Sequence, residues 1–301
     1  MIYNFTETQQ DKVIEKWGKD FYAEILNHLE VYSEKWNLFD FEFVEYYSFN
    51  AIFFCKSELY GDCVLKIYGE ISEYNALREY NNSGKFCKVF ECDLENTVML
   101  IERIIPGKML REEASLEKRL AVFSELFDGL HIAPKNPVIP DSSGISAFTE
   151  WVINTADYII NKREDNKKLY IHALKAKDIY LDMLSVYDKK LLIHGDLHCD
   201  NIISCKNGKY KIVDPFGWIG DPVFEIGRYI SQEYWKAEPE SRVKIIDNIS
   251  DFFESSLNIP NKIIKQCFYI DITINNCWIV KDGFTANMDD VRFAETVLDK
   301  A

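Results

Sequence analysis

The spacing of apolar residues predicts a helix followed by a sheet in the first third of the chain. Val13, Trp17, Phe21, Ile25 and Leu29 recur at every fourth position, which predicts one amphipathic helix over residues 8–34. Residues 41–102 carry β-branched and aromatic runs separated by short polar breaks, a pattern typical of strands. We expect strands at 41–46, 52–56, 63–68, 88–93 and 97–102, and a short helix at 72–80. This part therefore predicts a five-stranded antiparallel sheet that carries helices.

Beyond Pro106-Gly107 the pattern becomes helical. Helix caps and three-to-four periodicity predict helices at 115–130, 145–163, 170–187, 221–236, 239–257, 260–281 and 288–300. Only residues 191–214 interrupt this texture, and the proline-rich stretch 133–143 is expected to be a surface loop. The chain therefore predicts an α+β fold with two lobes, residues 1–103 and residues 104–301.

The balance of charges narrows the class of partner. The chain has 35 Lys and Arg against 49 Asp and Glu, a formal net charge of -14, which repels phosphate backbones and anionic membranes. We therefore expect neither a nucleic acid nor a membrane as partner, whereas a cationic small molecule is compatible with this charge. Monomer and homodimer stay open as alternatives.

The cysteines and the N-terminal residues favour a cytoplasmic protein with reduced thiols. None of the eight cysteines forms a Cys-x-x-Cys pair, and several lie in apolar runs where thiols pack as small hydrophobes. The first residues are polar and acidic, unlike the basic and then apolar order of a secretory signal. No apolar run approaches the roughly 20 residues that a membrane-spanning helix requires.

The stretch that interrupts the helices carries the candidate chemistry. An apolar strand at 191–193 leads into His194-Gly195-Asp196, Asn201 follows five places after Asp196, and a second apolar run ends at Asp214. Phosphoryl transfer requires a carboxylate that orients the attacking hydroxyl, together with oxygen ligands that hold Mg²⁺ against the phosphates. The types and spacing of Asp196, Asn201 and Asp214 fit those two requirements.

These segments resemble the aminoglycoside phosphotransferase family, which has a protein-kinase-like fold. His194 to Asn201 follows the family's H-G-D-x-x-x-x-N pattern, and Asp214-Pro215-Phe216-Gly217 resembles its metal-binding motif. The run at 220–226 is similar to that of the streptomycin 6-kinase and hydroxyurea phosphotransferase subgroup, with Glu225 in place of a second Asp. The resemblance implies that Asp196 is catalytic, that Asn201 and Asp214 bind Mg²⁺, and that Asp221 supports the catalytic loop. We expect His194 to brace the same loop by hydrogen bonds.

The resemblance extends into the predicted sheet. Lys66, in the run Cys63 to Ile67, resembles the strand lysine that binds the α- and β-phosphates, and Glu73 resembles the helix glutamate that pairs with it. Glu70 and Glu79 are rivals for that pairing.

Residues 99–107 resemble the connection between the lobes of such kinases. The resemblance implies that backbone groups around Glu102 and Ile104 meet adenine. The first hairpin lacks the glycines of the usual phosphate loop, so contacts to the phosphates would fall to Ser48 and Asn50. The implied cofactors are Mg²⁺ and ATP, with GTP open as the alternative nucleotide.

Candidates for the acceptor site lie in the later helices. Asp271, Asn275 and Trp278 recur at helical steps of four and three and form one stripe, with Trp218 and Glu233 as weaker candidates. The favoured function is transfer of the γ-phosphoryl group to a hydroxyl of a streptomycin-like aminoglycoside, which would confer antibiotic resistance. Two alternatives stay open: a kinase of a metabolic alcohol such as choline, homoserine, a methylthio-sugar or hydroxyurea, and a nucleotide-binding scaffold without catalysis.

Overall fold

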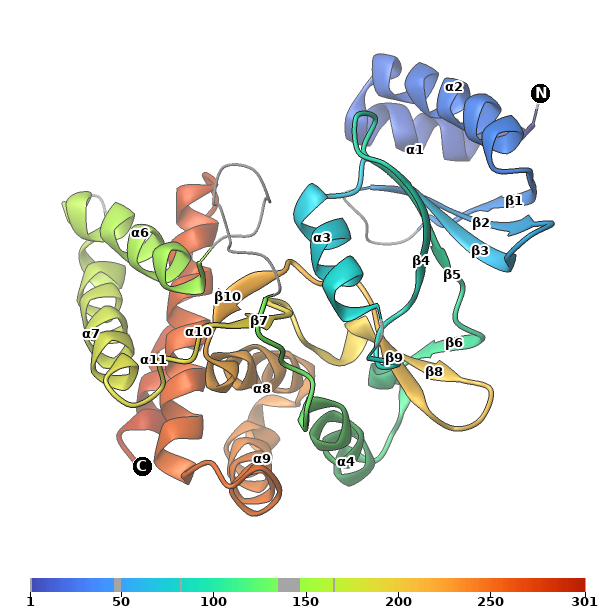
Figure 1. Ribbon diagram of the computed structural model, residues 1–301. Helices are drawn as coiled ribbons and strands as arrows, with labels where there is room; N and C mark the ends of the chain where they lie inside the picture. Colours follow the sequence, from blue (N-terminus) through green and yellow to red (C-terminus); the bar gives the residue numbers. More distant parts are fainter. Residues whose placement is uncertain (1, 46–49, 82, 135–146, 165, 301) are drawn as a thin grey trace.

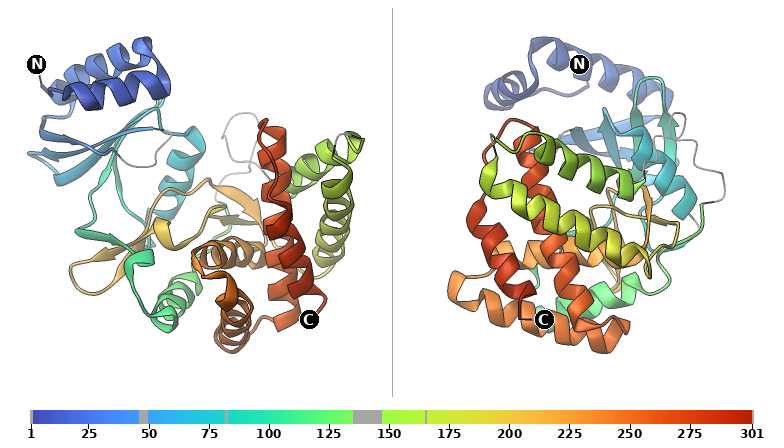
Figure 2. Two further views of the ribbon diagram at one scale, coloured as in Figure 1. Left: turned by 180° about the vertical axis from the view of Figure 1, so that it is seen from behind. Right: turned by 90° about the vertical axis from the view of Figure 1, so that its left-hand side faces the viewer.

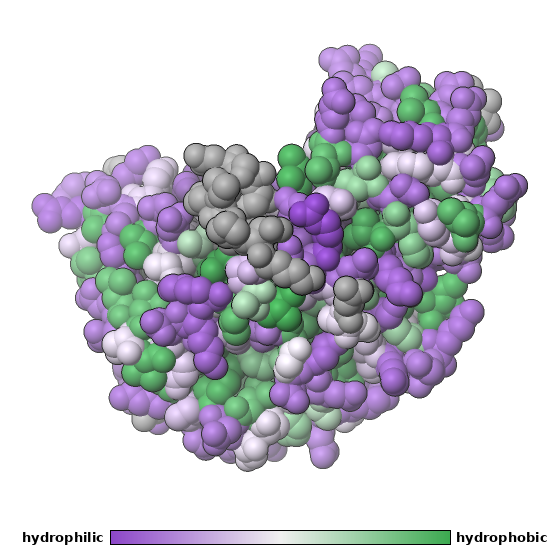
Figure 3. Space-filling model, in the orientation of Figure 1, coloured by the Kyte–Doolittle hydropathy of each residue, from purple (hydrophilic) through white to green (hydrophobic). Residues whose placement is uncertain are grey.

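The chain folds into two lobes of unequal size. The computed structural model describes residues 2–45, 50–81, 83–134, 147–164 and 166–300. One lobe gathers the large sheet with the first three helices, and the other contains the remaining helices (Figure 1). The surface view, in the orientation of Figure 1, shows a broad notch between the two lobes (Figure 3). The fold is therefore α+β with a sheet lobe and a mainly helical lobe.

The predicted five-stranded antiparallel sheet is confirmed. Its strands lie side by side in the order β1-β2-β3-β5-β4, and every neighbouring pair is antiparallel. The elements are β1 (Leu38–Phe43), β2 (Ala51–Ser57), β3 (Gly61–Ile67), α3 (Ile71–Tyr80), β4 (Val89–Asp93) and β5 (Val98–Glu102). These bounds differ from the predicted ones by three residues at most.

The prediction of one N-terminal helix is wrong. Two helices form instead, α1 (Glu7–Trp17) and α2 (Lys19–Lys35), because the chain turns at Gly18 with a φ of 96°. A residue with a Cβ rarely adopts this φ, so a glycine breaks the helix there although the apolar periodicity continues through it. Both helices cover the outer face of the sheet (Figure 2).

The alternation of side chains along β3 separates the core from the site. Leu65 and Ile67 are fully buried in the cluster beneath α1 and α2. Lys66 lies between them in sequence and therefore points to the opposite face of the sheet, toward the helical lobe. One strand thus contributes both to the outer core and to the cleft.

The helical lobe follows the predicted order. Its helices are α4 (Leu116–Phe127), α6 (Phe148–Asn161), α7 (Lys167–Leu184), α8 (Glu225–Lys236), α9 (Arg242–Leu257), α10 (Asn261–Lys281) and α11 (Met288–Leu298). Most of the predicted loop at 133–143 lies outside the described residues. Within the described part, no helix has the length and apolar character needed to cross a membrane.

Short strands link the lobes, and some were not predicted. They are β6 (Pro106–Met109), β7 (Leu191–Ile193), β8 (Ile202–Cys205), β9 (Tyr210–Ile212) and β10 (Trp218–Gly220). Strand β6 pairs with β8, and β10 pairs with β7. The sequence of β6 contains a proline, a glycine and a lysine, so neither alternation nor β propensity indicates a strand.

Contacts after α3 fix one lobe against the other. The amide of Cys87 donates to the carbonyl of Ile212 at 3.0 Å, and the amide of Ile212 donates to the carbonyl of Lys85 at 2.8 Å. The hydroxyl of Tyr80 donates to the carbonyl of Leu192 at 2.7 Å. These bonds dock α3 and the segment that follows it on the strands that frame the catalytic loop.

We expect the outer core to be essential for stability. Phe53 is fully buried and contacts the rings of Tyr3, Phe5, Phe41 and Phe43. Phe53→Ala should lower the free energy of unfolding by about 3–5 kcal/mol, because it removes a buried ring and leaves a cavity. Urea unfolding followed by circular dichroism measures this change.

The matched control is Phe39→Ala on the neighbouring strand, where the side chain is 44% exposed. It should change stability by no more than about 0.5 kcal/mol. Equal effects of the two substitutions would contradict the assignment of this core.

Candidate active site

A buried lysine joins three segments at the centre of the cleft. The ammonium of Lys66 lies 2.5 Å from Oε2 of Glu73 on α3 and 2.5 Å from Oδ1 of Asp214. Lys66 and Glu73 are both almost fully buried. Burial lowers the pKa of Lys66, but the charges of Asp214 and Glu73 outweigh this effect and hold its pKa above the usual range. Glu73, and neither of its two rivals, therefore occupies the predicted position.

The two carboxylates differ in their environment. Burial raises the pKa of Glu73 to about 7 against the opposing effect of Lys66. The charge of Lys66 lowers the pKa of Asp214, whose side chain is half exposed. Asp214 is thus the carboxylate that stays ionised and open to the cleft.

The loop that carries Asp196 begins at a glycine, and any residue with a side chain would be strained there. Gly195 has a φ of 86°, and a Cβ there would lie 3.0 Å from the ring of Trp218. The loop then runs through Asp196 to η2 (Cys199–Asn201). The absence of a side chain at Gly195 lets Trp218 on β10 lie against the backbone next to Asp196.

Two histidines hold this loop from inside. The Nδ1 atom of His194 accepts the amide of Asp196 at 3.1 Å, so its proton lies on Nε2, which donates to the carbonyl of Val213 at 2.9 Å. The Nδ1 atom of His198 accepts the amide of Asp200 at 3.2 Å. Its Nε2 proton therefore faces Oδ2 of Asp196 at 3.3 Å. Burial lowers the pKa of His194, which favours the neutral ring that these bonds require.

Asp196 is held by a cation that the sequence did not reveal. The Nε atom of Arg228 on α8 donates to Oδ1 of Asp196 at 2.5 Å. Burial acts to raise the pKa of Asp196, but the hydrogen bond from His198 and the charge of Arg228 hold it below the usual range. Asp196 is consequently an ionised and oriented carboxylate at neutral pH.

Asn201 and Asp214 offer the donor set that Mg²⁺ prefers. The Nδ2 atom of Asn201 donates to the carbonyl of Asp196 at 2.9 Å, which leaves the amide oxygen as its ligand atom. Asp214 adds a carboxylate from a backbone with a φ of 60°, a conformation uncommon for a residue with a side chain. An amide oxygen and a carboxylate are hard ligands, so these residues fit Mg²⁺ shared with phosphates.

The loop is braced by Glu225 where the sequence suggested Asp221. Glu225 accepts the amide of Gly195 at 2.7 Å through Oε1, and its Oε2 lies 2.5 Å from Nε2 of His131. Asp221 instead accepts the amides of Val223 and Lys189 at 3.0 and 3.1 Å. The direct bond to the loop thus comes from the residue noted only as a departure from the family pattern.

Glu233 is not placed to meet an acceptor. It is buried and accepts two hydrogen bonds from the guanidinium of Arg119, at 2.7 and 2.5 Å. The thiol of Cys199 also donates to Glu233 at 3.1 Å. The prediction of a substrate contact is therefore wrong, and Glu233 supports the far end of the catalytic loop. Periodicity identified a polar residue on α8 but not which face was buried.

The predicted nucleotide contacts lie on the connection between the lobes. The amide of Glu102 donates to the carbonyl of Lys88 at 2.8 Å, so it is already used within the sheet. For the amide of Ile104, no acceptor is found among the described residues. Ser48 lies outside the described residues, and Asn50 directly precedes β2. Of the two connection residues, Ile104 therefore has the more suitable amide for adenine.

The stripe on α10 lies beside Asp196. The charges of Arg228 and Asp196 both affect the pKa of Asp271. A Cβ at Gly227 would collide with the carbonyl of Cys267, so α8 and α10 pack closely here. Asn275 donates to the carbonyl of Asp271 at 2.8 Å. Trp278, on the same face, is 42% exposed.

One carboxylate oxygen of Asp271 lacks a hydrogen-bond donor within the described part of the chain. Its Oδ2 atom is buried and has no hydrogen-bond partner among the described residues. Burial raises the pKa of Asp271 although the nearby Arg228 opposes this. A buried acceptor atom without a donor is costly, which suggests that a ligand supplies the missing donor.

Aromatic rings line the same region. The ring centroid of Trp218 lies 4.9 Å from that of Trp151, 5.4 Å from that of Phe148 and 5.4 Å from that of Phe216. Asp271 borders a small cavity lined also by Phe148 and Trp151. The region beside Asp196 thus combines a buried carboxylate with aromatic faces.

The functional residues that sequence reasoning missed are partners from distant segments. Arg228 is 32 residues from Asp196, Arg119 is 114 residues from Glu233, and His131 is 94 residues from Glu225. Arg228 lies one helical turn after Glu225, and this spacing was the only local sign that it shares a face with a bracing residue.

Comparison with known proteins finds a matching family and a related enzyme. The family model described as aminoglycoside/hydroxyurea antibiotic resistance kinase matches residues 65–283. The streptomycin 6-kinase of Streptomyces griseus is 22% identical over 212 residues, which cover 70% of this chain and 67% of that protein.

Solved structures share the fold at low identity. The choline kinase LicA from Streptococcus pneumoniae is 13% identical, with a TM-score of 0.65 over 93% of this chain and 100% of that chain. A thermostable mutant of the aminoglycoside phosphotransferase APH(4)-Ia, in a ternary complex with ADP and hygromycin B, is 15% identical. Its TM-score is 0.58 over 90% of this chain and 96% of that chain.

The pair of Arg119 and Glu233 gives a test of the structural role assigned to Glu233. Glu233→Ala should lower the free energy of unfolding by about 3–5 kcal/mol, because it leaves a buried guanidinium without its partner. The double variant Arg119→Met/Glu233→Leu should recover most of that loss, and the exposed Glu240→Ala serves as control. Urea unfolding measures all three, and unchanged stability of Glu233→Ala would contradict the assignment.

Proposed function

The chain belongs to the aminoglycoside/hydroxyurea antibiotic resistance kinase family, and from this premise we propose that it transfers the γ-phosphoryl group of ATP to a hydroxyl of a cationic aminoglycoside of the streptomycin type. Members of this family are phosphotransferases with an alcohol group as acceptor. The finer proposal, that the acceptor is an aminoglycoside and that resistance follows, is supported by the streptomycin 6-kinase relative.

One observation carries the choice of a cationic acceptor. Asp271 has a buried carboxylate oxygen without a partner, and it lies near the catalytic carboxylate through their shared neighbour Arg228. A protonated amine is the donor that such an oxygen lacks, since charge-assisted bonds are the strong ones. An amine bound at Asp271 would bring a nearby hydroxyl of the same molecule toward Asp196.

The proposed nucleotide contacts lie in the sheet lobe and in the connection between the lobes. We assign residues 1–103 to nucleotide binding and residues 104–301 to the catalytic loop and acceptor site. The amide of Ile104 would bind adenine, Asn50 and Ser48 would flank the phosphates, and Lys66, oriented by Glu73, would bind the α- and β-phosphates. When bound at Asn201 and Asp214, Mg²⁺ would neutralise charge on the phosphates.

The acceptor side depends on how Asp196 is held. Its pKa lies below the usual range, so it is a weak base that orients the hydroxyl and accepts the proton late in the transfer. A loose transition state suits this role, because bond breaking to the leaving phosphate runs ahead of attack. Arg228 and His198 hold the two carboxylate oxygens, so the hydroxyl must share one of them.

A second candidate is a kinase of a small amino alcohol such as choline. The aromatic faces of Trp218 and Trp151 beside a carboxylate favour it, because aromatic faces bind methylated ammonium groups by cation–π attraction. The fold match to choline kinase shows only a common fold at 13% identity. Asp196, Asn201 and Asp214 lie together around one cleft, which speaks against a scaffold without catalysis.

A substrate panel separates these candidates. Purified protein with ATP and Mg²⁺ is assayed for ADP release with streptomycin, hygromycin B, choline, ethanolamine, homoserine and hydroxyurea. We expect turnover with streptomycin above that with the amino alcohols. Turnover with choline and none with any aminoglycoside would replace the first candidate by the second.

Asp196 gives a direct test of the chemistry. Asp196→Asn should lower kcat by at least about 10²-fold, because the positioned proton acceptor is lost. The dissociation constant for ATP, measured by calorimetry, should change little. The matched control is Asp200→Asn in the same loop, where the carboxylate pairs with Arg111 at 2.6 Å. Near-parental turnover of Asp196→Asn would refute the assigned role.

Asp271 tests the acceptor site separately from the chemistry. Asp271→Asn should raise the KM for the cationic acceptor by about 10- to 100-fold, the loss of a charge-assisted bond, with a much smaller change in kcat. The KM for ATP should stay the same. Asp282→Asn, at the exposed end of the same helix, is the control. An unchanged acceptor KM would remove Asp271 from the site.

A further inference from the structure

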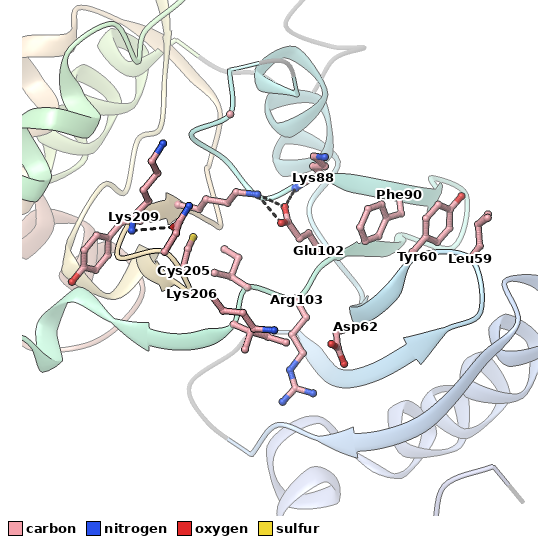
Figure 4. A pocket seen from close by; sticks show the side chains of 16 residues that line it. Leu59, Tyr60, Asp62, Lys88, Phe90, Glu102, Arg103, Cys205, Lys206 and Lys209 are labelled. Carbon is pink, nitrogen blue, oxygen red and sulfur yellow. Dashed lines mark hydrogen bonds and ion pairs between the residues drawn. The ribbon is translucent and has the colours of Figure 1, made fainter.

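A second cavity lies on the far side of the connection between the lobes. Its volume is about 770 Å³, and it is lined by the β2–β3 turn, the first part of β4, residues 102–105 and the β8–β9 hairpin (Figure 4). Lys66, Asp196, Asn201 and Asp214 do not line it. Tyr60 and Phe90, which do, pack with the core beneath α1 and α2, on the face of the sheet opposite Lys66. This cavity is therefore distinct from the proposed phosphate site.

The charge of this cavity is opposite to that of the whole protein. Its lining includes five basic side chains, Lys88, Arg103, Lys206, Lys209 and Lys211, and two acidic ones, Asp62 and Glu102. The chain as a whole has a formal charge of -14. A general requirement for solubility does not explain a local excess of cations in such an acidic protein.

Most of these cations lack a close carboxylate. Lys211 is neutralised by Glu102 at 2.6 Å. Among the described residues, no ion pair is found for Lys88, Lys206 or Lys209. Arg103 lies over the ring of Phe54 at 3.8 Å and reaches only Glu42, at 3.9 Å.

Two of the cations that line the cavity come from different lobes. Arg103 belongs to the connection that follows β5, and Lys206 to the turn of the β8–β9 hairpin; the Lys206 side chain extends toward Arg103 (Figure 4). Like charges that line one cavity repel one another unless an anion compensates them. The arrangement is therefore suited to an anionic group that contacts both side chains.

Part of the remaining wall of the cavity is aromatic or aliphatic. The rings of Tyr60 and Phe90 stack with centroids 4.5 Å apart and planes 3° from parallel. Ile104 and Ile105 add aliphatic surface from the connection. A ligand with a planar ring can lie against such a wall while its charged group meets the cations.

We propose that this cavity binds a small molecule in which a phosphate monoester is joined to a planar ring, such as a nucleoside monophosphate. Arg103 and Lys206 bind the phosphate, and the ring packs against Tyr60 and Phe90. The site is separate from the acceptor site and does not depend on which alcohol the enzyme phosphorylates.

The test measures binding of AMP to protein whose ATP site is already filled. With saturating non-hydrolysable ATP analogue and Mg²⁺ present, titration calorimetry should detect one further AMP site, with Kd between about 10 μM and 1 mM for a few charge-assisted contacts. Lys206→Glu should weaken this binding by at least about tenfold, since it replaces a phosphate contact by a repelling charge. The kcat and the KM for ATP should stay at the parental values.

Two controls make the outcome decisive. Lys244→Ala, an exposed lysine on α9, should leave AMP binding unchanged. Tyr60→Leu should weaken AMP binding while leaving the cations in place, because it removes one ring of the stack. The absence of any AMP binding in the saturated protein would overturn the proposal, as would equal affinity in Lys206→Glu and the parent.

Discussion

The ammonium of Lys66 is the constraint on which the arrangement of the cleft depends. A buried cation is tolerated only when carboxylates compensate it, and here Glu73 and Asp214 lie within 2.5 Å of its Nζ. The three residues come from a strand, a helix and the loop after β9, so this one requirement fixes α3 against the sheet and the loop of Asp214 against both. Bonds from Ile212 to Lys85 and Cys87 hold the same segments together from the other side. A displacement of α3 would leave the buried ammonium of Lys66 with only one of its two carboxylates, and this cost holds α3 in place.

The catalytic loop is held in a different way, by side chains of α8. Glu225 accepts the amide of Gly195, Arg228 binds the carboxylate of Asp196, and Glu233 accepts the thiol of Cys199. The loop is thus fixed at its beginning, at its reacting group and near its end by one helix. Glu233 is itself held in place, because it accepts two hydrogen bonds from Arg119. The position of Asp196 is therefore set by packing in the helical lobe, while Lys66 is set by the sheet lobe.

Much of the fold and the centre of the site could be predicted from the sequence because their signals are local. Runs of β-branched and aromatic residues between polar breaks predicted the sheet, and the short spacing from Asp196 to Asn201 defines a loop whatever surrounds it. Distant partners left no such signal: the pairing of Arg119 with Glu233 joins residues 114 positions apart. Helical periodicity also cannot tell a buried polar face from an exposed one, which is why Glu233 was misassigned. The break at Gly18 was missed because the apolar repeat continues through it, and β6 was missed because its pairing with β8 outweighs weak propensity.

The residues around Asp196 and the candidate acceptor residues lie on two different helices, which affects how such an enzyme can diversify. The residues that hold the chemistry lie on α8, whereas Asp271, Asn275 and Trp278 lie on α10. If the proposed acceptor site is correct, exchanges on the open face of α10 would alter which molecules are accepted and leave Asp196 in place. The freedom has a limit at Gly227, where a Cβ would collide with the carbonyl of Cys267. New substrates are thus more readily admitted by changing the polarity of the α10 face than by enlarging residues between the two helices.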